Sequence, residues 1–308
     1  MKMLTRAAFD RAAASLRAEA RPLEQALFAH RFEGGSRTAV LAALAPYQNA
    51  DGGFGRALEP DMRAAASSVV ATTLALDIFR RLGATEETSG LPAALVYLID
   101  SFDVETQRWP IVSPEVEEAP HAPWWDYAES ADNFRGFWAN PRASVIGYLW
   151  QYRKLVPSPF VEGALRAVAN DLLSYAHHME MHDLQCFVDL LETNNLPGEL
   201  RTDMLDKLRR AVARSVVSDP AAWDDYNLKP LTVVRAPDSP LAQALAATAI
   251  DSNLDYLIDT QGEDGAWAPA WSWDFVDAAA WAAAAREWRG VLTLRNLETL
   301  RAFGRIES

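Results

Sequence analysis

The chain has 308 residues, of which 50% are hydrophobic and 23% charged, so it can bury a large core as one large domain or two ordinary ones. Its formal net charge of −13 and its pI of about 4.9 exclude attraction to nucleic-acid phosphates and to anionic lipid headgroups. Its single cysteine, Cys186, excludes an intrachain disulfide. We therefore expect no nucleic-acid partner.

The N-terminal stretch MKMLTRAAFDRAAASLRAEARP carries charges every few positions and lacks the apolar core of a signal peptide. No apolar run in the rest of the chain approaches the roughly 18 residues of a membrane span. We therefore expect a cytoplasmic protein without a transmembrane segment.

The apolar residues recur at spacings of three and four, whereas period-two alternation of branched residues is scarce. This pattern predicts an all-α chain. Proline suits the first turn of a helix and pushes the residue before it into an extended cap, so each X-Pro pair marks a helix start. The marked starts are Asn140-Pro141, Ser158-Pro159, Asp219-Pro220 and Ser239-Pro240.

In chain order, the spacing predicts helices near residues 5–18, 36–47, 66–82, 91–101, 141–155, 161–177, 182–193, 200–216, 240–259 and 288–303. Two long segments, 103–139 and 218–238, interrupt the helices, and no Gly/Ser linker divides them. Loops of this length inside a domain are typically functional lids or rims. We expect a single domain over residues 1–308, with segment 103–139 acting as a lid or as a plug.

One short motif occurs twice, and internal repetition is a strong guide to architecture. QNADGGFG near residue 50 and TQGEDGAW near residue 264 share the pattern QxxDGx(F/W), and we call residues 48–54 and 261–267 the first and second turn motifs. Glycine after Asp permits a left-handed turn, the Gln amide can bond to helix ends, and the aromatic ring can pack over the turn. The motifs pair Gln48, Asp51, Gly52 and Phe54 with Gln261, Asp264, Gly265 and Trp267.

A degenerate third copy appears when YLIDSFDVETQRWP at 97–110 is aligned with YLIDTQGEDGAWAP at 256–269. The helix end and the Trp are kept, but the Gln and the Gly are lost. Two unrelated Asp-Gly turns would not explain these matches, so a repeated helical hairpin is the better interpretation.

The turn motifs resemble the QW motif of the terpene cyclase and protein prenyltransferase superfamily. This resemblance covers the two motifs directly and the rest of the chain only through its helix content. It implies an α/α toroid of the α6/α6 type, a double ring of helical hairpins. It also implies a central cavity, lined by the surplus of the 11 tryptophans, that binds an isoprenoid ligand.

The catalytic signatures of that superfamily are missing. Its protonating cyclases share a DxDD run that keeps one acid protonated, and its ionising cyclases share a DDxxD run, and neither run occurs in this sequence. The remaining candidate acids are Asp61, Asp224 and Asp225, with Glu59 as a substrate contact beside Asp61. The alternatives are a helix cap for Asp61 and a solvated loop pair for the other two.

Two aromatic segments are candidate binding surfaces. PHAPWWDY holds His121 between prolines and ahead of Trp124 and Trp125, so a stiff loop presents aromatic rings and an imidazole that can carry a proton near neutral pH. WAPAWSWD alternates Trp271 and Trp273, which would place two rings on one side of an extended segment as a stacking platform. The alternative for the first segment is a plug.

HHMEMHDLQC is a candidate zinc site. His182 and Cys186 stand four residues apart on one face of a predicted helix, with Asp183 between them, and zinc accepts N, S and O ligands. The prenyltransferases that the chain resembles also use Asp, Cys and His, but with the Asp two residues before the Cys and the His far downstream. A buried thiol beside a surface imidazole is the alternative interpretation.

We expect a terpenoid cyclase-like or prenyltransferase-like protein that binds an apolar, isoprenoid ligand and cyclises or isomerises it by acid catalysis. Tryptophan faces would stabilise the carbocations. One alternative is a carbohydrate-active hydrolase or lyase that pairs Asp225 with Glu59 or Asp61. Another is a noncatalytic ligand-binding or scaffold protein. The expected partner is thus a small apolar molecule or a sugar.

Overall fold

The described chain is built from helices, as the apolar spacing predicts. The structure is a computed structural model that describes residues 1–134, 136–175 and 178–307. Within these ranges the extended backbone pairs are isolated bridges and no strand is formed. No helix in the same ranges is both long and apolar enough to cross a membrane. The prediction of an all-α fold is confirmed.

Residue contacts group the chain into two units, which we call the terminal unit (residues 1–44 and 216–308) and the central unit (residues 45–215). The helices of the terminal unit are α1 (Arg6–Glu19), α2 (Pro22–Phe32), α3 (Arg37–Leu44), η5 (Pro220–Ala222), α11 (Pro230–Val233), η6 (Ala242–Ala244), α12 (Ala247–Asp259) and α13 (Ala278–Ala302). Those of the central unit are η1 (Ala45–Tyr47), α4 (Val69–Arg81), α5 (Leu91–Asp100), η2 (Pro114–Glu118), η3 (Pro123–Trp125), α6 (Ser130–Asn133), α7 (Arg142–Gln151), η4 (Arg153–Leu155), α8 (Ser158–Ser174), α9 (Met181–Leu191) and α10 (Gly198–Ser215).

Most predicted helices begin and end within a few residues of their predicted bounds, but two begin elsewhere and one helix of three turns was not predicted. Helix α13 begins about ten residues early because Asp277 caps it, accepting from the Ala280 N–H, and a run of alanines with high helix propensity follows. The predicted start at Ser239-Pro240 is wrong, since α12 begins only at Ala247. Helix α2 was not predicted, although Pro22 at its first position is the signal.

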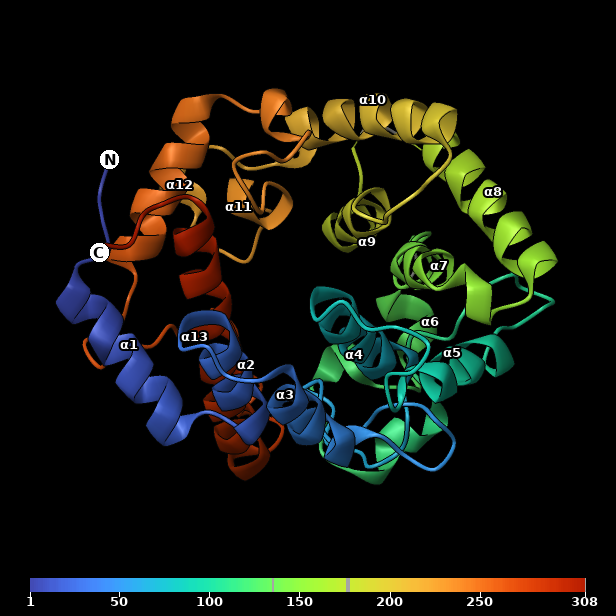
Figure 1. Cartoon of the computed structure of the whole chain (residues 1–308), viewed down its shortest axis with the longest axis horizontal. Coiled ribbons are helices and arrows are strands. Elements are labelled where there is room, and N and C mark those ends of the chain that lie inside the picture. Colours follow the sequence, from blue (N-terminus) through green and yellow to red (C-terminus); the bar gives the residue numbers. More distant parts are fainter. Residues whose placement is uncertain (135, 176–177, 308) are drawn as a thin grey trace. The chain divides into compact units, whose positions relative to one another are not determined.

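The helices of the central unit stack in two layers. In the central unit α7 contacts both α4 and α9, and these three form one layer. Helices α5, α8 and α10 form the second layer, each packed against the long helix that precedes it (Figure 1). In the terminal unit α13 packs against α1 and α2, and α2 packs against α3. In the central unit, α4 and α5, α7 and α8, and α9 and α10 therefore pack as pairs whose members lie in different layers.

The first turn motif connects three helices of the central unit. The Gln48 Nε2 atom donates to the carbonyl oxygens of Gly52 and Gly90, both at 2.8 Å, and Gly90 is the N-cap of α5. The Phe54 N–H donates to Thr72 Oγ1 on α4 at 2.9 Å. The turn after α3 and η1 is thereby fixed to the next two helices.

The second turn motif makes the equivalent bonds in the terminal unit. The Gln261 Nε2 atom donates to the carbonyl oxygens of Gly265 at 2.9 Å and of Ala8, on α1, at 3.1 Å. The Trp267 N–H donates to Thr293 Oγ1 on α13 at 3.1 Å. The same contacts in both units confirm that the two motifs are one repeated turn.

The degenerate third copy keeps part of this turn. Trp109 Nε1 donates to the Leu98 carbonyl near the end of α5 at 2.6 Å, as Trp267 Nε1 donates to a carbonyl of α12 at 2.8 Å. Phe102 takes the place of the Gln, and its ring lies 5.0 Å from that of Phe160 in the first turn of α8. A ring contact thus replaces the amide bond to the following helix.

Replacing Thr72 or Thr293 with valine should lower the free energy of unfolding by about 1–3 kcal/mol, because each change leaves the buried N–H of the motif's aromatic residue without its acceptor. Urea unfolding followed by circular dichroism measures the loss. Thr73→Val is the matched control: Thr73 makes the same bond to a helix carbonyl, at 2.7 Å to Val69, but is not the acceptor for the turn. Equal losses in T72V and T73V would contradict this role.

Candidate functional site

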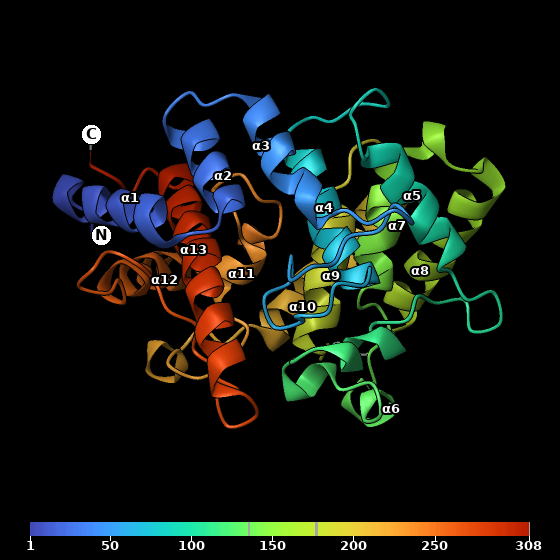
Figure 2. The same cartoon turned by 90° about the horizontal axis from the view of Figure 1, so that it is seen from below.

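Helices α4, α7 and α9 of the central unit begin beside one segment, residues 110–140, which we call the cap segment. Ser68, the N-cap of α4, lines a small pocket together with Ser113 and Val116 of the cap segment. Helix α7 follows the cap segment directly, and Asp183 in the first turn of α9 binds the cap-segment backbone. Figure 2 shows the cap segment, with α6, gathered at one end of these helices. The N-terminal ends of three helices therefore meet it.

The cap segment forms most of an aromatic pocket of about 280 Å³. Two arginines line it: the exposed Arg108 guanidinium lies 5.4 Å from the centre of the Trp138 ring, and the buried Arg142 forms an ion pair with Asp171. The aromatic residues that line the pocket are Trp109, Tyr127, Phe134, Phe137 and Trp138.

Asp183 fixes one wall of this pocket. Its side chain is completely buried, and Oδ1 accepts from the N–H groups of Ala139 at 2.9 Å and Asn140 at 2.8 Å. Oδ2 accepts from the Trp138 N–H at 2.8 Å and from the Tyr175 hydroxyl at 2.7 Å. Burial, and then the bond to Asp183, raise the pKa of Tyr175, so the hydroxyl stays a donor. Asp183 thus holds the end of the cap segment against α9.

This role bears on the expected zinc ligands His182, Asp183 and Cys186. His182 Nδ1 bonds to the Glu180 carboxylate at 2.7 Å, and Cys186 Sγ lies 3.7 Å from Asn140 Oδ1. Burial alone would raise the pKa of Glu180, but the bond to His182 and its charge lower it. Three His, Cys, Asp or Glu side chains that could share a metal ion have ligand atoms within 4.8 Å of one another. In the described ranges such a group is found in the cap segment and not at these three residues. Asp183 is occupied as a structural acceptor.

Two segments singled out by the sequence lie side by side in the central unit. Met62 and His121 form an antiparallel bridge, the Ala122 N–H donates to the Asp61 carbonyl at 2.9 Å, and Arg63 pairs with the cap segment through its N–H. Asp61 is only 2% exposed, and Glu59 lines a pocket of about 20 Å³, which is room for about one water. The structure therefore brings the candidate acid Asp61 and the candidate proton carrier His121 onto two extended backbone segments that lie side by side.

The cap-segment tryptophans lie in η3, directly after His121. Trp125 packs against the small core cluster that Met62 forms with two valines, and its ring lies 6.0 Å from that of Phe134. Trp124 is partly exposed beside it. These contacts place Trp125 between the Asp61 segment and the aromatic pocket.

The other candidates lie in the terminal unit. The Tyr256 hydroxyl donates to Asp224 Oδ1 at 3.0 Å, and Asp225 is exposed. Trp273 is 0% exposed and packs against a tryptophan in the first turn of α13, Trp281, whereas Trp271 is partly exposed. The expected platform of two open rings is therefore wrong for Trp273, because its segment turns the ring into the core.

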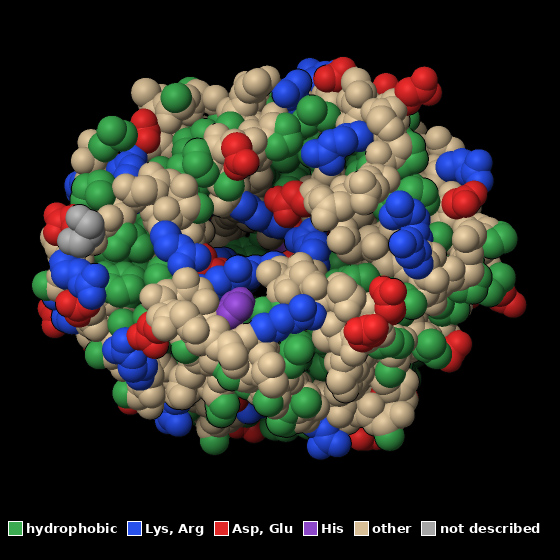
Figure 3. Space-filling view, in the orientation of Figure 1, with side chains coloured by type: hydrophobic (Ala, Val, Ile, Leu, Met, Phe, Trp, Pro, Cys, Tyr) green, Lys and Arg blue, Asp and Glu red, His purple; other side chains and the backbone are tan. Residues whose placement is uncertain are grey.

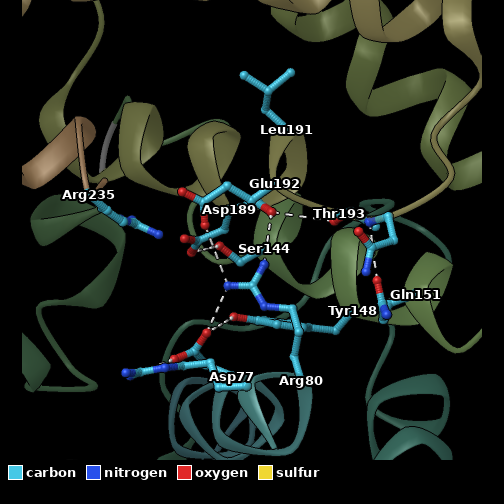
Figure 4. A network of polar contacts seen from close by, with 12 residues as sticks. Asp77, Arg80, Ser144, Tyr148, Gln151, Asp189, Leu191, Glu192, Thr193 and Arg235 are labelled. Atoms are coloured by element: carbon cyan, nitrogen blue, oxygen red, sulfur yellow. Dashed lines mark hydrogen bonds and ion pairs between the residues drawn. The ribbon is translucent and has the colours of Figure 1, made fainter. Parts of the chain in front are cut away.

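A polar network that the sequence analysis missed joins α4, α7 and α9 (Figure 4). The Arg80 guanidinium donates to Asp77 at 2.8 Å, lies 3.6 Å from Glu192, and stacks 5.2 Å from the centre of the Tyr148 ring. Burial alone would lower the pKa of Arg80, but Tyr148, Asp77 and Asp189 outweigh burial and raise it, so the charge is retained. The sequence signal for this network is Asp77, an acidic residue within the apolar stretch ALDIF. The residues of the network are Asp77, Arg80, Ser144, Tyr148, Asp189 and Glu192.

The surface carries charges of both signs despite the net charge of −13. Figure 3 shows Lys and Arg side chains interspersed with Asp and Glu side chains on the face drawn there. Exposed pairs such as Lys2 with Asp259, at 2.5 Å, contribute at most about 1 kcal/mol each. Mixed charge of this kind is typical of a solvated surface and differs from the basic stripe of a nucleic-acid interface.

The cap segment, with its aromatic pocket and the paired Asp61 and His121 segments, is the candidate functional site. Sequence reasoning identified His121, Trp124 and Trp125 within it but missed the pocket. The missed signal is the interleaving of aromatic and basic residues in NFRGFWANPR, ahead of α7. No protein-family model, curated protein or solved structure matches this chain.

Proposed function

We propose that the chain is an α/α toroid of the QW-motif kind, a single domain over residues 1–308, that binds a small apolar ligand of the isoprenoid class. The toroid is supported by the alternation of helices between two layers in the central unit and by the turn that is repeated in both units. The ligand class is supported by the aromatic pocket of the cap segment, which carries the proposal.

The composition of the pocket selects the ligand. Five aromatic side chains line the pocket, which suits an unsaturated hydrocarbon, and about 280 Å³ is near the lower end of small-molecule pockets, so a short isoprenoid fits better than a long polyene. The exposed Arg108 in the lining suits an anionic head such as a diphosphate, because a guanidinium group binds two phosphate oxygens at once. The ligand is an apolar body with a charged end.

A second candidate function is acid-catalysed isomerisation or cyclisation of the same ligand class. The bridge that joins the Asp61 and His121 segments favours it, because it places the segment with the buried Asp61 beside the cap segment, which carries the His121 imidazole. The described residues that line the aromatic pocket include no Asp or Glu. Binding is therefore the primary proposal, and turnover would need the side chains of Asp61 and His121.

Trp138→Ala should weaken the binding of geranyl diphosphate at least about tenfold, or about 1.4 kcal/mol, because it removes one wall and the ring that Arg108 covers. Arg108→Gln should weaken geranyl diphosphate but leave neutral geraniol unchanged. Isothermal titration calorimetry measures both. The matched controls are Trp150→Ala and Arg153→Gln, a stacked pair at 5.1 Å that does not line the pocket.

These controls should bind both ligands as the parent protein does. Binding of neither ligand by the parent protein would overturn the isoprenoid assignment, and equal losses in W138A and W150A would place the ligand elsewhere. Product analysis after incubation with geranyl diphosphate tests the second candidate, which predicts turnover that disappears in Asp61→Asn and His121→Gln variants.

A further inference from the structure

The cap segment holds three metal-ligating side chains that do not line the aromatic pocket, and one of them is His121, the histidine of the second candidate function. One ligand atom each of Glu117, His121 and Asp126 lies within 4.8 Å of the others. His121 Nε2 is 3.9 Å from Glu117 Oε2, too far for a hydrogen bond, and a small approach of the exposed Glu117 side chain would bring the two atoms to the separation of about 3.4 Å found around one zinc ion. The three residues come from η2, from the extended stretch after it and from the end of η3.

The imidazole is held in the tautomer that a metal needs. His121 Nδ1 lies 2.9 Å from the Ala119 carbonyl oxygen, which can only accept, so Nδ1 carries the proton. The lone pair of the neutral ring is therefore on Nε2, the atom that faces Glu117. A metal-bound histidine typically donates its other N–H to a backbone carbonyl in this way, and the bond fixes the ring orientation.

Both carboxylates are positioned by backbone groups. Glu117 Oε1 accepts from the Tyr127 N–H at 2.7 Å, and the opposite oxygen, Oε2, faces the imidazole. Asp126 Oδ1 accepts from the Glu129 N–H at 3.1 Å. Each acid is thus anchored to the loop that follows, and its orientation does not depend on a bound ion.

The histidine itself stands on a rigid support. Its backbone pairs with Met62, the flanking residues bond to the segment around Asp61, and its side chain is 13% exposed. The Glu117 side chain is 45% exposed, so the site is open to solvent on that side. Three ligands on a fixed frame with one open side leave positions for water.

We propose that Glu117, His121 and Asp126 bind one divalent transition-metal ion of the zinc class, through one nitrogen and two carboxylate oxygens with water completing the coordination. An N and O ligand set of this kind suits Zn²⁺, whereas Ca²⁺ and Mg²⁺ prefer oxygen alone. The site is distinct from the His182, Asp183 and Cys186 stretch, and it stands independently of the isoprenoid ligand. It links residues 117 and 126, so the ion stabilises the part of the cap segment that carries Tyr127, a residue lining the aromatic pocket.

The test is Zn²⁺ binding to the full chain, measured by calorimetry and by metal content after dialysis against trace Zn²⁺. We expect one equivalent in the parent protein and at least tenfold weaker binding in each of Glu117→Gln, His121→Gln and Asp126→Asn. The matched control is His30→Gln: His30 makes the same Nδ1 bond to a carbonyl, 2.8 Å to Gly35, but belongs to no described ligand group. H30Q and Cys186→Ser should bind Zn²⁺ as the parent protein does.

Replacement with Co²⁺ gives a readout that depends on the ligands and not on folding. The proposed site predicts visible d–d bands without a sulfur-to-cobalt charge-transfer band, and these bands are lost in H121Q. A charge-transfer band that disappears in C186S would move the metal to Cys186 and overturn the proposal. Less than one-tenth of an equivalent of Zn²⁺ in the parent protein, or undiminished binding in all three site variants, would overturn it as well.

Discussion

Asp183→Ala should lower the free energy of unfolding of the chain by about 3–5 kcal/mol, one of the two largest effects we expect from a single substitution. The substitution leaves the N–H groups of Trp138, Ala139 and Asn140 and the Tyr175 hydroxyl without their common acceptor in a fully buried position. Each unsatisfied buried donor costs about 1–3 kcal/mol, and relaxation of the cap segment recovers part of the sum. Chemical denaturation measures the loss.

Asp103→Ala is the matched control for that substitution. The Asp103 carboxylate also accepts from two backbone N–H groups and one hydroxyl, those of Glu105 and Thr106, but it is exposed, so water replaces it when it is removed. We expect a much smaller loss. Asp183→Asn separates charge from shape, because its amide can accept at one oxygen only and turns an NH₂ group toward donors. A stability of D183A equal to that of D103A would contradict the anchoring role.

D183A should also affect the site, because the acceptor it removes holds the backbone of Trp138. Geranyl diphosphate binding should weaken in D183A even under conditions where the helices remain folded by circular dichroism. The Tyr175→Phe variant removes one of the four bonds and keeps the carboxylate. It should cost about 1 kcal/mol and leave ligand binding close to that of the parent protein.

The sequence predicts those features of the fold that depend on local physics. Helix positions follow from the spacing of apolar residues and from caps, since both act within one or two turns. The repeated turn is predictable in part, because the Gln48 side chain bonds to Gly52 within the turn, whereas its bond to Gly90, the N-cap of α5, joins residues far apart in the chain. The errors at α2 and α13 fall where the signal is a proline at the helix start, or a cap followed by a run of alanines, and not the spacing of apolar residues.

The site is harder to predict because it depends on contacts between segments far apart in the chain. The sequence around His121 does not show that its backbone pairs with Met62, because a single bridge produces no alternation of apolar and polar residues in either segment. The acid of the HDLQC stretch could equally bind zinc or a loop, and the choice is made by residues 138–140. Trp271 and Trp273 differ in burial because the irregular segment between α12 and α13 does not keep strand geometry.

Gly52→Ala and Gly265→Ala should each lower the free energy of unfolding by about 2–4 kcal/mol, through left-handed strain and overlap together. Both glycines have a positive φ, 90° and 89°. A Cβ atom on Gly52 would lie 2.4 Å from the Ala93 carbonyl oxygen of α5, and one on Gly265 would lie 2.4 Å from the carbonyl carbon of Arg11 on α1. Helix backbone cannot yield as a flexible side chain can, so the turn must separate from the helix.

The chain provides a matched control for each glycine in its own unit. Gly83 and Gly304 have positive φ angles of 62° and 65°, but a Cβ atom there meets no described atom within 4 Å. Gly83→Ala and Gly304→Ala should therefore cost only the strain of the left-handed conformation, about 1 kcal/mol. The difference between G52A and G83A, and between G265A and G304A, isolates the overlap with the neighbouring helix.

If the two turn motifs are equivalent joints of one repeated hairpin, these differences agree within about 1 kcal/mol, the usual variation between similar sites. Losses in G52A and G265A no larger than in their controls would show that neither turn is fixed to the helix it contacts.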